Sequence, residues 1–161
     1  MGKEITVGIA DMKFTRMEGR LITYALGSCV GVCLYDPIAK VGAMVHVMLP
    51  QKLENSVDSN VFKFADTGIR ATIRKMEVFG AVKRRLIAKI AGGAKMFDIP
   101  GGGSLGNIGQ RNIESVRQTL KAEGIPIVAE DVGSNYARTL VFDCTNGQGN
   151  IRSFGRKEVI F

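Results

Sequence analysis

The chain has 161 residues, 45% of them apolar and 23% charged, and carries a formal net charge of +7. These values are ordinary for a soluble globular protein, and the length suits one domain with a sizeable core, so we expect a single domain over residues 1–161. No apolar run approaches the roughly 20 residues that a membrane helix needs, and the N-terminus lacks a signal-peptide pattern. We therefore expect a cytoplasmic protein without membrane insertion.

The basic residues are dispersed along the chain, and the densest run is Lys83-Arg84-Arg85. No nucleic-acid-binding motif accompanies them, so we expect no nucleic-acid partner. The excess positive charge indicates either a solvated basic surface or a surface that meets an acidic protein. Three cysteines are an odd number, which argues against a disulfide framework. Two of them, Cys33 and Cys144, are interpreted as packing residues.

In chain order, the apolar patterns predict several strands, a helix, a strand, a second helix and closing strands. The first strands are expected at 5–10, 20–26, 30–35 and 41–49, followed by a polar loop. One helix is expected from about residue 58 or 59 to Gly80, and another follows the glycine-rich loop 92–109 and ends at Gly124. The remaining strands are expected at 86–91, 125–132, 139–144, 150–154 and 157–161, with a hairpin turn at Asn146-Gly147. This order predicts a mixed α+β domain.

A β-hairpin is predicted around Asp36-Pro37-Ile38-Ala39, because Asp and Pro in the first two positions are typical of a type I turn. If Asp36 pairs with Ala39, alternate residues of the two strands meet in apolar pairs that suit a buried face. These pairs are Leu34 with Val41, Val32 with Ala43 and Val30 with Val45. The same register places Cys29 opposite His46 on the other face, with Cβ atoms roughly 4.5–5.5 Å apart.

Cys29 and His46, the single histidine, are the candidate reactive pair. A cysteine beside a base is a strong nucleophile, because the thiolate is the reactive form. Gly27 and Ser28 precede the cysteine, and backbone amides near Ser28 and Cys29 could form the oxyanion hole that acyl transfer requires. The alternative is that both side chains only pack in the core, and spacing alone does not decide between the two. A single histidine, with no second cysteine pair nearby, predicts no metal site.

The glycine-rich loop contains Gly101-Gly-Gly103-Ser-Leu-Gly106, which satisfies the dinucleotide pattern G-x-G-x-x-G. That fingerprint needs its first glycine in the tight turn directly after a strand, whereas here residues 92–100 intervene. Nucleotide binding is therefore the weaker interpretation. We expect instead a flexible loop whose exposed Met96 and Phe97 contact a partner, or a plain surface turn.

Several segments, spread over most of the chain, carry a specific resemblance. They are Leu26-Gly-Ser-Cys-Val30, Asp36-Pro37, Lys40-Val-Gly-Ala-Met-Val-His-Val-Met-Leu-Pro50, Lys89-Ile-Ala-Gly-Gly-Ala-Lys-Met-Phe97, Asn107-Ile-Gly-Gln-Arg-Asn112 and Ala129-Glu-Asp131. Together they closely resemble the chemoreceptor glutamine deamidases of the CheD family. The resemblance implies a cysteine nucleophile at Cys29, a base at His46 and an orienting threonine at Thr23. It also implies mixed β-sheets packed in a sandwich-like core with flanking helices, similar to the deamidating domain of cytotoxic necrotising toxins.

The family resemblance also implies a function. Family members convert glutamines of methyl-accepting chemotaxis receptors to glutamate, and can hydrolyse glutamyl methyl esters, without a cofactor. Some bind a CheC-type response-regulator phosphatase through a surface shared with the active site. The expected partners are thus the receptors and such a phosphatase. The alternative is a non-catalytic interaction module that regulates the phosphatase. This chain departs from the family pattern in Gly101-Gly-Gly-Ser104, which concerns how that loop would meet a partner.

Overall fold

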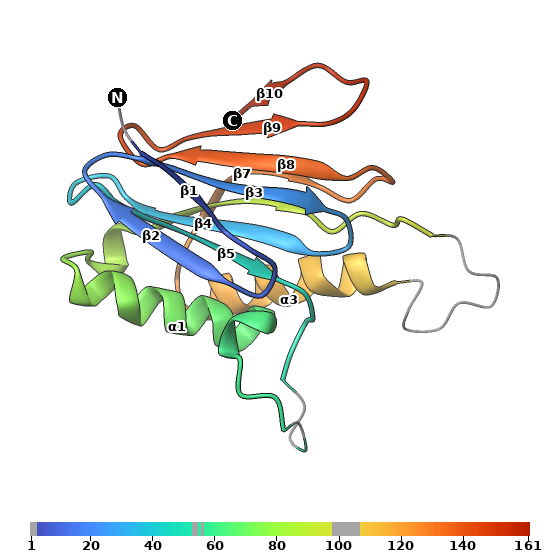
Figure 1. Ribbon diagram of the computed structural model, residues 1–161. Helices are drawn as coiled ribbons and strands as arrows, with labels where there is room; N and C mark the ends of the chain where they lie inside the picture. Colours follow the sequence, from blue (N-terminus) through green and yellow to red (C-terminus); the bar gives the residue numbers. More distant parts are fainter. Residues whose placement is uncertain (1–2, 53–54, 56, 98–106) are drawn as a thin grey trace.

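The protein is described from a computed structural model that covers residues 3–52, 55, 57–97 and 107–161 (Figure 1). Within these residues the chain forms ten strands, two α-helices and two short 3-10 helices. The strands are β1 (Glu4–Thr6), β2 (Met12–Arg16), β3 (Arg20–Leu26), β4 (Val30–Asp36), β5 (Val41–Val47), β6 (Ile87–Gly92), β7 (Ile127–Val132), β8 (Arg138–Asp143), β9 (Gln148–Arg152) and β10 (Val159–Ile160). The helices are η1 (Val61–Lys63), α1 (Ala65–Val78), η2 (Lys83–Arg85) and α3 (Ile108–Ala122).

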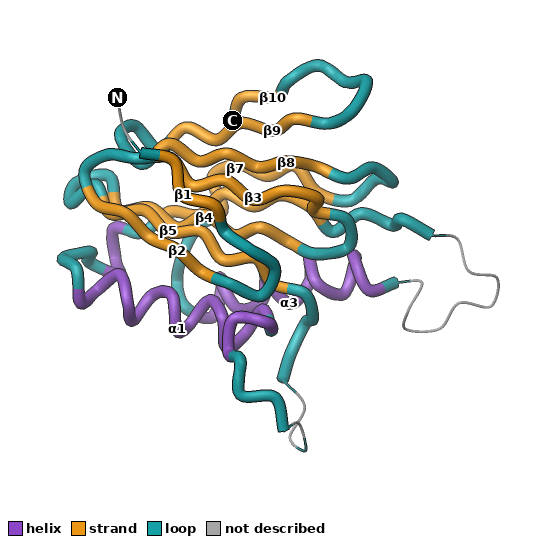
Figure 2. Tube along the Cα trace, viewed as in Figure 1, coloured by secondary structure: helices purple, strands orange, loops and turns teal. Residues whose placement is uncertain are grey.

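Two mixed five-stranded sheets stack face to face, and both α-helices pack on one of them (Figure 2). The first sheet has the order β1-β3-β8-β9-β10, and the second has the order β2-β5-β4-β6-β7. Each contains a single parallel pair, β1 with β3 and β6 with β7. The predicted α+β class, with packed mixed sheets and flanking helices, is confirmed. No helix in the described part of the chain is both long and apolar enough to cross a membrane.

The second sheet is buried on both faces, because the helices cover one face and the first sheet covers the other. Every residue of β4 and β5 is buried. Their side chains alternate between two cores: Val32 and Leu34 pack with the helices, whereas Cys33 and Met44 pack with the first sheet. This double burial explains why both strands are continuous apolar runs. The space between the sheets, which we call the inter-sheet core, contains the candidate site.

The β4–β5 hairpin forms as predicted, but its register differs by two residues. Asp36 pairs with Val41 instead of Ala39, and Leu34 pairs with Ala43. A type I turn in a two-residue loop does not match the twist of the strands that it joins. The loop therefore extends to Lys40, which adopts a left-handed φ of 53°. Because a shift of two preserves the alternation, every side chain keeps its predicted face.

The predicted strand at 5–10 is wrong in its extent. β1 ends at Thr6, and the chain turns through Ala10, whose φ is 57°, before β2 runs antiparallel to β5. Sequence reasoning missed β2 because charged residues interrupt its short apolar alternation. Met12 and Phe14 nevertheless pack against the helix-side core.

Both predicted helices are confirmed, the first with a later start. The backbone of Phe64 is extended and pairs with Leu49, so α1 begins only at Ala65, after the short helix η1. The Asn146-Gly147 turn between β8 and β9 is also confirmed, and Gly147 has the left-handed φ of 77° that favours glycine there.

Candidate functional site

His46 lies on the face of β5 that meets the first sheet, and its side chain is fully buried. Its face follows from Met44, two residues earlier on β5, which packs in the inter-sheet core. The backbone of His46 is held from the side of β2. Its N–H donates to the carbonyl of Asp11 at 3.0 Å, and its carbonyl accepts from the N–H of Ala10 at 2.9 Å. These bonds hold the backbone of β5 at the residue that carries the imidazole.

Thr23, on β3 of the opposite sheet, contacts the imidazole directly. Its Oγ1 lies 2.7 Å from His46 Nδ1 and donates to the carbonyl of Val7 at 2.8 Å. A hydroxyl has one proton and a carbonyl can only accept, so the proton of Thr23 is committed to Val7. Thr23 must then accept from Nδ1–H. The neutral imidazole therefore carries its proton on Nδ1, which leaves Nε2 as a buried base without a partner among the described residues.

A β-bulge lets both Thr23 and Leu26 face the inter-sheet core. Thr23 pairs with Leu140 and Leu26 pairs with Arg138, so β3 contains one more residue than β8 over this interval. Ala25 adopts a φ of 57° within the bulge. Thr23 and Leu26 are three residues apart, and on a regular strand residues at an odd separation point to opposite faces. The extra residue of the bulge lets both point to the same face.

Cys29 directly precedes β4 and is half-buried against the inter-sheet core. It thus shares a face with His46, as the side-chain alternation predicts. The expected direct opposition is wrong, because Gly31 lies opposite His46. Cys29, two residues before Gly31, is a diagonal neighbour of His46, and diagonal Cα atoms are roughly 7–8 Å apart. The two-residue shift of the hairpin causes this difference.

The nucleophile segment, which we define as Gly27-Ser28-Cys29, is held by the chain that follows β6. The carbonyls of Gly27 and Cys29 accept from the N–H groups of Ala94 and Gly93, each at 2.8 Å. The backbones of Gly92 and Cys29 lie too close together for a side chain at position 92, because a Cβ there would lie 2.3 Å from the carbonyl oxygen of Cys29. No acceptor for the Ser28 N–H is found in the part of the chain that the structure describes.

Burial sets the protonation of both candidate reactive groups. It raises the pKa of the Cys29 thiol above its ordinary value, an effect that the backbone N–H of Cys29 partly offsets. It lowers the pKa of His46 to about 4. At neutral pH the pair is therefore a thiol and a neutral imidazole. Such a pair can transfer a proton from sulfur to nitrogen as the sulfur attacks an electrophile.

The two other cysteines lie in the inter-sheet core and are fully buried. Burial raises the pKa of Cys144 to about 12 and raises that of Cys33 well above its ordinary value. Both thiols are consequently protonated at neutral pH, which agrees with their interpretation as packing residues.

Met96 lies beside the nucleophile segment, and Phe97 follows it in the chain. A Cβ on Gly27 would lie 3.1 Å from Met96 Cγ, so the Met96 side chain covers this glycine. Met96 is 41% exposed and Phe97 76%. Met96 also lines a pocket, together with Lys95, Ser134 and Asn135. The glycine-rich stretch 101–106, with its dinucleotide-like pattern, lies outside the described residues.

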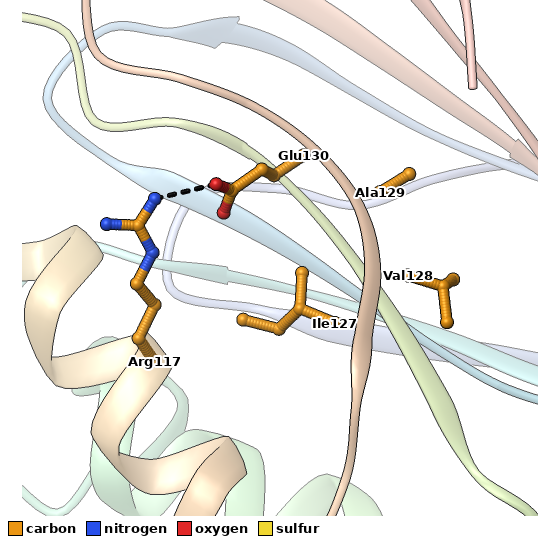
Figure 3. A pocket seen from close by; sticks show the side chains of 5 residues that line it. All are labelled: Arg117, Ile127, Val128, Ala129 and Glu130. Carbon is orange, nitrogen blue, oxygen red and sulfur yellow. Dashed lines mark hydrogen bonds and ion pairs between the residues drawn. The ribbon is translucent and has the colours of Figure 1, made fainter.

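A separate pocket lies between α3 and the edge strand β7 (Figure 3). Arg117 reaches from the helix to an ion pair with Glu130, at 2.8 Å, above the side chain of Ile127. None of the candidate site residues lines this pocket. Within the described residues, no cluster of three or more histidine, cysteine, aspartate or glutamate side chains could hold a metal ion.

Two contributors to this geometry were not predicted from the sequence. One is the carbonyl of Val7, and the other is the pair of amides at Gly93 and Ala94. Backbone groups carry no side-chain signal, so pattern reasoning could not have found them. Gly92-Gly93 before an alanine was the only hint of a close backbone approach.

Comparison with known proteins identifies the family. The model of the family described as "CheD chemotactic sensory transduction" matches residues 48–153, more than half of the chain. The chain belongs to the CheD family. A CheD protein of Caldanaerobacter subterraneus subsp. tengcongensis is 50% identical over 153 residues, covering 95% of this chain and 94% of the relative. One of Syntrophomonas wolfei is 44% identical and covers 99% of both chains.

A third relative, from Clostridium novyi, is 47% identical and covers 94% of both chains. All three CheD relatives carry the name "probable chemoreceptor glutamine deamidase". Their matches extend over nearly the whole chain.

Proposed function

We propose that this CheD-family protein deamidates glutamine side chains of methyl-accepting chemotaxis receptors, with Cys29 as nucleophile and His46 as base. The observation that carries the proposal is the commitment of the His46 proton to Thr23, which leaves Nε2 free on the face that Cys29 shares. The names of relatives that match over nearly the whole chain support the substrate class.

In the first half of the reaction, Sγ of Cys29 attacks the side-chain carbonyl carbon of the glutamine, and His46 Nε2 takes the thiol proton. The carbonyl oxygen becomes an oxyanion that accepts hydrogen bonds from backbone amides of Ser28 and Cys29. Losing one such donor typically costs about 10²–10³ in rate. The protonated His46 then donates to the departing nitrogen. The C–N bond breaks, ammonia leaves, and a thioester joins Cys29 to the substrate.

In the second half, His46 removes a proton from water, whose oxygen attacks the thioester carbonyl. The C–S bond breaks, and the proton on His46 returns to sulfur. The products are a receptor glutamate and the free Cys29 thiol. A glutamyl methyl ester would form the same thioester and release methanol instead of ammonia.

The environment of the nucleophile segment supports the oxyanion role of its amides. The carbonyls of Gly27 and Cys29 are bound by Ala94 and Gly93, which orients the peptide units. The backbone N–H of Cys29 lies close enough to its own sulfur to lower the pKa of the thiol. It is therefore near the point where the substrate carbonyl must arrive.

A second candidate function is the binding of a CheC-type phosphatase, for which the exposed Met96 and Phe97 are the supporting observation. Exposed large apolar side chains are typical of contact surfaces. Because Met96 covers Gly27, a partner bound there would lie beside Cys29. Receptor and phosphatase would then compete for one surface.

The proposal is tested by incubating wild type, Cys29→Ala and Cys33→Ala with a purified cytoplasmic receptor fragment. Peptide mapping by mass spectrometry then measures conversion of glutamine to glutamate. We expect conversion by wild type and Cys33→Ala and none by Cys29→Ala. The Cys33 variant is a matched control, because it removes a buried thiol from the same strand region. Equal absence of product from wild type and Cys29→Ala would favour the interaction module.

A further inference from the structure

We infer that Asn112, on α3, is a positioning residue that fixes the nucleophile segment relative to the end of the strand that carries His46. This role rests on the proposed function, and the contacts of Asn112 support it. Asn112 is fully buried, and it touches both segments with a single amide group.

The amide of Asn112 bridges two stretches of chain that are far apart in sequence. Its Nδ2 donates to the carbonyl of Ser28 at 2.9 Å and to the carbonyl of Met48 at 2.9 Å. Ser28 precedes Cys29, and Met48 follows His46 by two residues. One planar NH₂ group therefore sets the spacing between the segment with the candidate nucleophile and the strand with the candidate base.

The nitrogen and the oxygen of the Asn112 amide cannot exchange places. Both neighbours are carbonyl oxygens, which only accept, so the nitrogen must face them. The other end of the amide, Oδ1, is buried without a partner in the described part of the chain. A buried acceptor left unpaired is unfavourable. A buried polar atom without a hydrogen-bond partner is expected where the position of the residue matters for function.

The first turn of α3 is itself packed against the chain that binds the nucleophile segment. A Cβ on Gly109 would lie 2.5 Å from the carbonyl oxygen of Ala94, so the helix backbone touches this chain directly. Gly93 and Ala94 in turn donate to the carbonyls of Cys29 and Gly27. With Ser28 bound by Asn112, all three carbonyls of the segment are held, and Asn112 supplies the side-chain contact.

The inference predicts a loss in the chemical step and not in substrate binding. Without the two hydrogen bonds, Cys29 can move relative to His46, and a displacement of about 1 Å can reduce a rate by roughly 100-fold. Asn112 is buried and does not meet the substrate, so KM should change little. The Cys29 thiol should also become more exposed, which moves its pKa down toward the ordinary value.

The test compares wild type, Asn112→Leu and Asn112→Ser with two controls on the same helix. In Asn112→Leu an uncharged apolar side chain of similar shape replaces the amide and cannot donate. Serine, which tests the point if the first variant does not fold, can reach at most one carbonyl. Ser115→Ala removes a hydrogen bond from α3 to the carbonyl of Pro50 without touching the nucleophile segment. Val116→Ala removes buried core volume and controls for stability.

Two quantities are measured for each variant at a temperature where it is folded. The first is kcat and KM for the receptor fragment. The second is the pH profile of Cys29 alkylation by iodoacetamide, followed by peptide mapping, which needs no turnover. We expect roughly a 10- to 100-fold fall in kcat, KM within about twofold, and an alkylation profile shifted to lower pH for the Asn112 variants alone.

An Asn112→Leu or Asn112→Ser variant with wild-type kcat and an unshifted alkylation profile would overturn the inference. A fall in kcat that Val116→Ala matches at equal stability would also overturn it, because the effect would then be structural. If wild type itself forms no glutamate, the proposed function fails, and the alkylation profiles still decide whether Asn112 positions Cys29.

Discussion

His46 Nδ1 and Thr23 Oγ1 meet at 2.7 Å although they belong to different sheets. The hydroxyl of Thr23 donates its hydrogen bond to the carbonyl of Val7, so the direction of both hydrogen bonds at Thr23 is set. The tautomer of the His46 imidazole thus depends on how the two sheets pack. A neutral threonine stabilises a developing imidazolium less than a carboxylate does, so its main effect is on orientation and tautomer.

Replacing Thr23 by valine tests this chain of hydrogen bonds. The variant keeps the shape but leaves Nδ1 and the Val7 carbonyl unpaired, which should cost roughly 1–3 kcal/mol of unfolding free energy. We expect kcat to fall roughly 10- to 100-fold, because the imidazole loses its fixed tautomer and position. Steady-state kinetics and thermal unfolding measure the two effects.

The controls for this prediction are Thr23→Ser and Thr119→Val. Serine keeps the hydroxyl and should retain most of the activity. Thr119 donates to a carbonyl of its own helix, so Thr119→Val should affect stability alone. Because His46 is the only histidine, its nitrogen NMR signals are unambiguous. A wild-type imidazole protonated on Nε2 at neutral pH would contradict the hydrogen-bond assignment.

Burial of His46 makes stability depend on pH in a defined window. Its pKa falls from the ordinary value of 6.5 to about 4, so between these values only the unfolded chain binds the proton. Stability from this group is complete above 6.5 and is lost as pH falls toward 4, by an amount on the order of 3 kcal/mol. Denaturant unfolding at several pH values measures this slope. His46→Gln, which does not titrate, should show a flatter dependence in this window, and an equal slope would refute the assignment.

The buried carboxylate of Asp36 stabilises the closed end of the β4–β5 hairpin. It accepts from the N–H groups of Ile38, Ala39 and Val82 and pairs with Arg85 at 2.9 Å. Burial raises the pKa of this carboxyl, but the ion pair and the hydrogen bonds outweigh burial and hold the pKa at about 2. Asp36→Ala should lower the unfolding free energy by roughly 3–5 kcal/mol, since it leaves these donors unpaired. Chemical denaturation measures the loss.

The control for the Asp36 prediction is Asp143, which caps one backbone N–H near the surface. Asp143→Ala should cost roughly 1 kcal/mol. Because Asp36 lies at the end of the hairpin away from Cys29, folded Asp36→Ala should alkylate at Cys29 as wild type does. A changed alkylation profile would mean that the turn influences the site.

The net charge of +7 should influence encounter with an acidic receptor surface more than chemistry. We expect kcat/KM for the receptor fragment to fall as ionic strength rises, because salt screens charges on exposed surfaces. The value of kcat at saturating substrate should stay nearly constant. Initial rates across a salt series separate the two, and a kcat/KM that is indifferent to salt would count against electrostatic encounter.

Side-chain alternation was sufficient to predict which residues of the hairpin share a face. It predicted the common face of Cys29 and His46 because a period of two survives a shift of two. It could not fix the register, since Leu34 meets an apolar partner whether it pairs with Val41 or Ala43. The choice was made by turn geometry, where Lys40 takes the left-handed conformation.

Contacts between sheets were beyond pattern reasoning. Thr23 entered the site through family resemblance, because nothing in β3 alone indicates that its hydroxyl meets a histidine on another sheet. Its inward direction coexists with that of Leu26 only through a bulge. Asn112 likewise lies far from Ser28 and Met48 in sequence, and only the packing of α3 brings them together.

The most direct test of the account is to trap the acyl group that Cys29 is proposed to carry. Wild type and Cys29→Ala are incubated with the receptor fragment in neutral hydroxylamine, a nucleophile that competes with water for a thioester, and the receptor peptides are mapped by mass spectrometry. The account predicts that wild type converts target glutamines to both glutamate and glutamyl hydroxamate, and that Cys29→Ala produces neither. Glutamate formation by Cys29→Ala at the wild-type rate, with no hydroxamate from either protein, would contradict it.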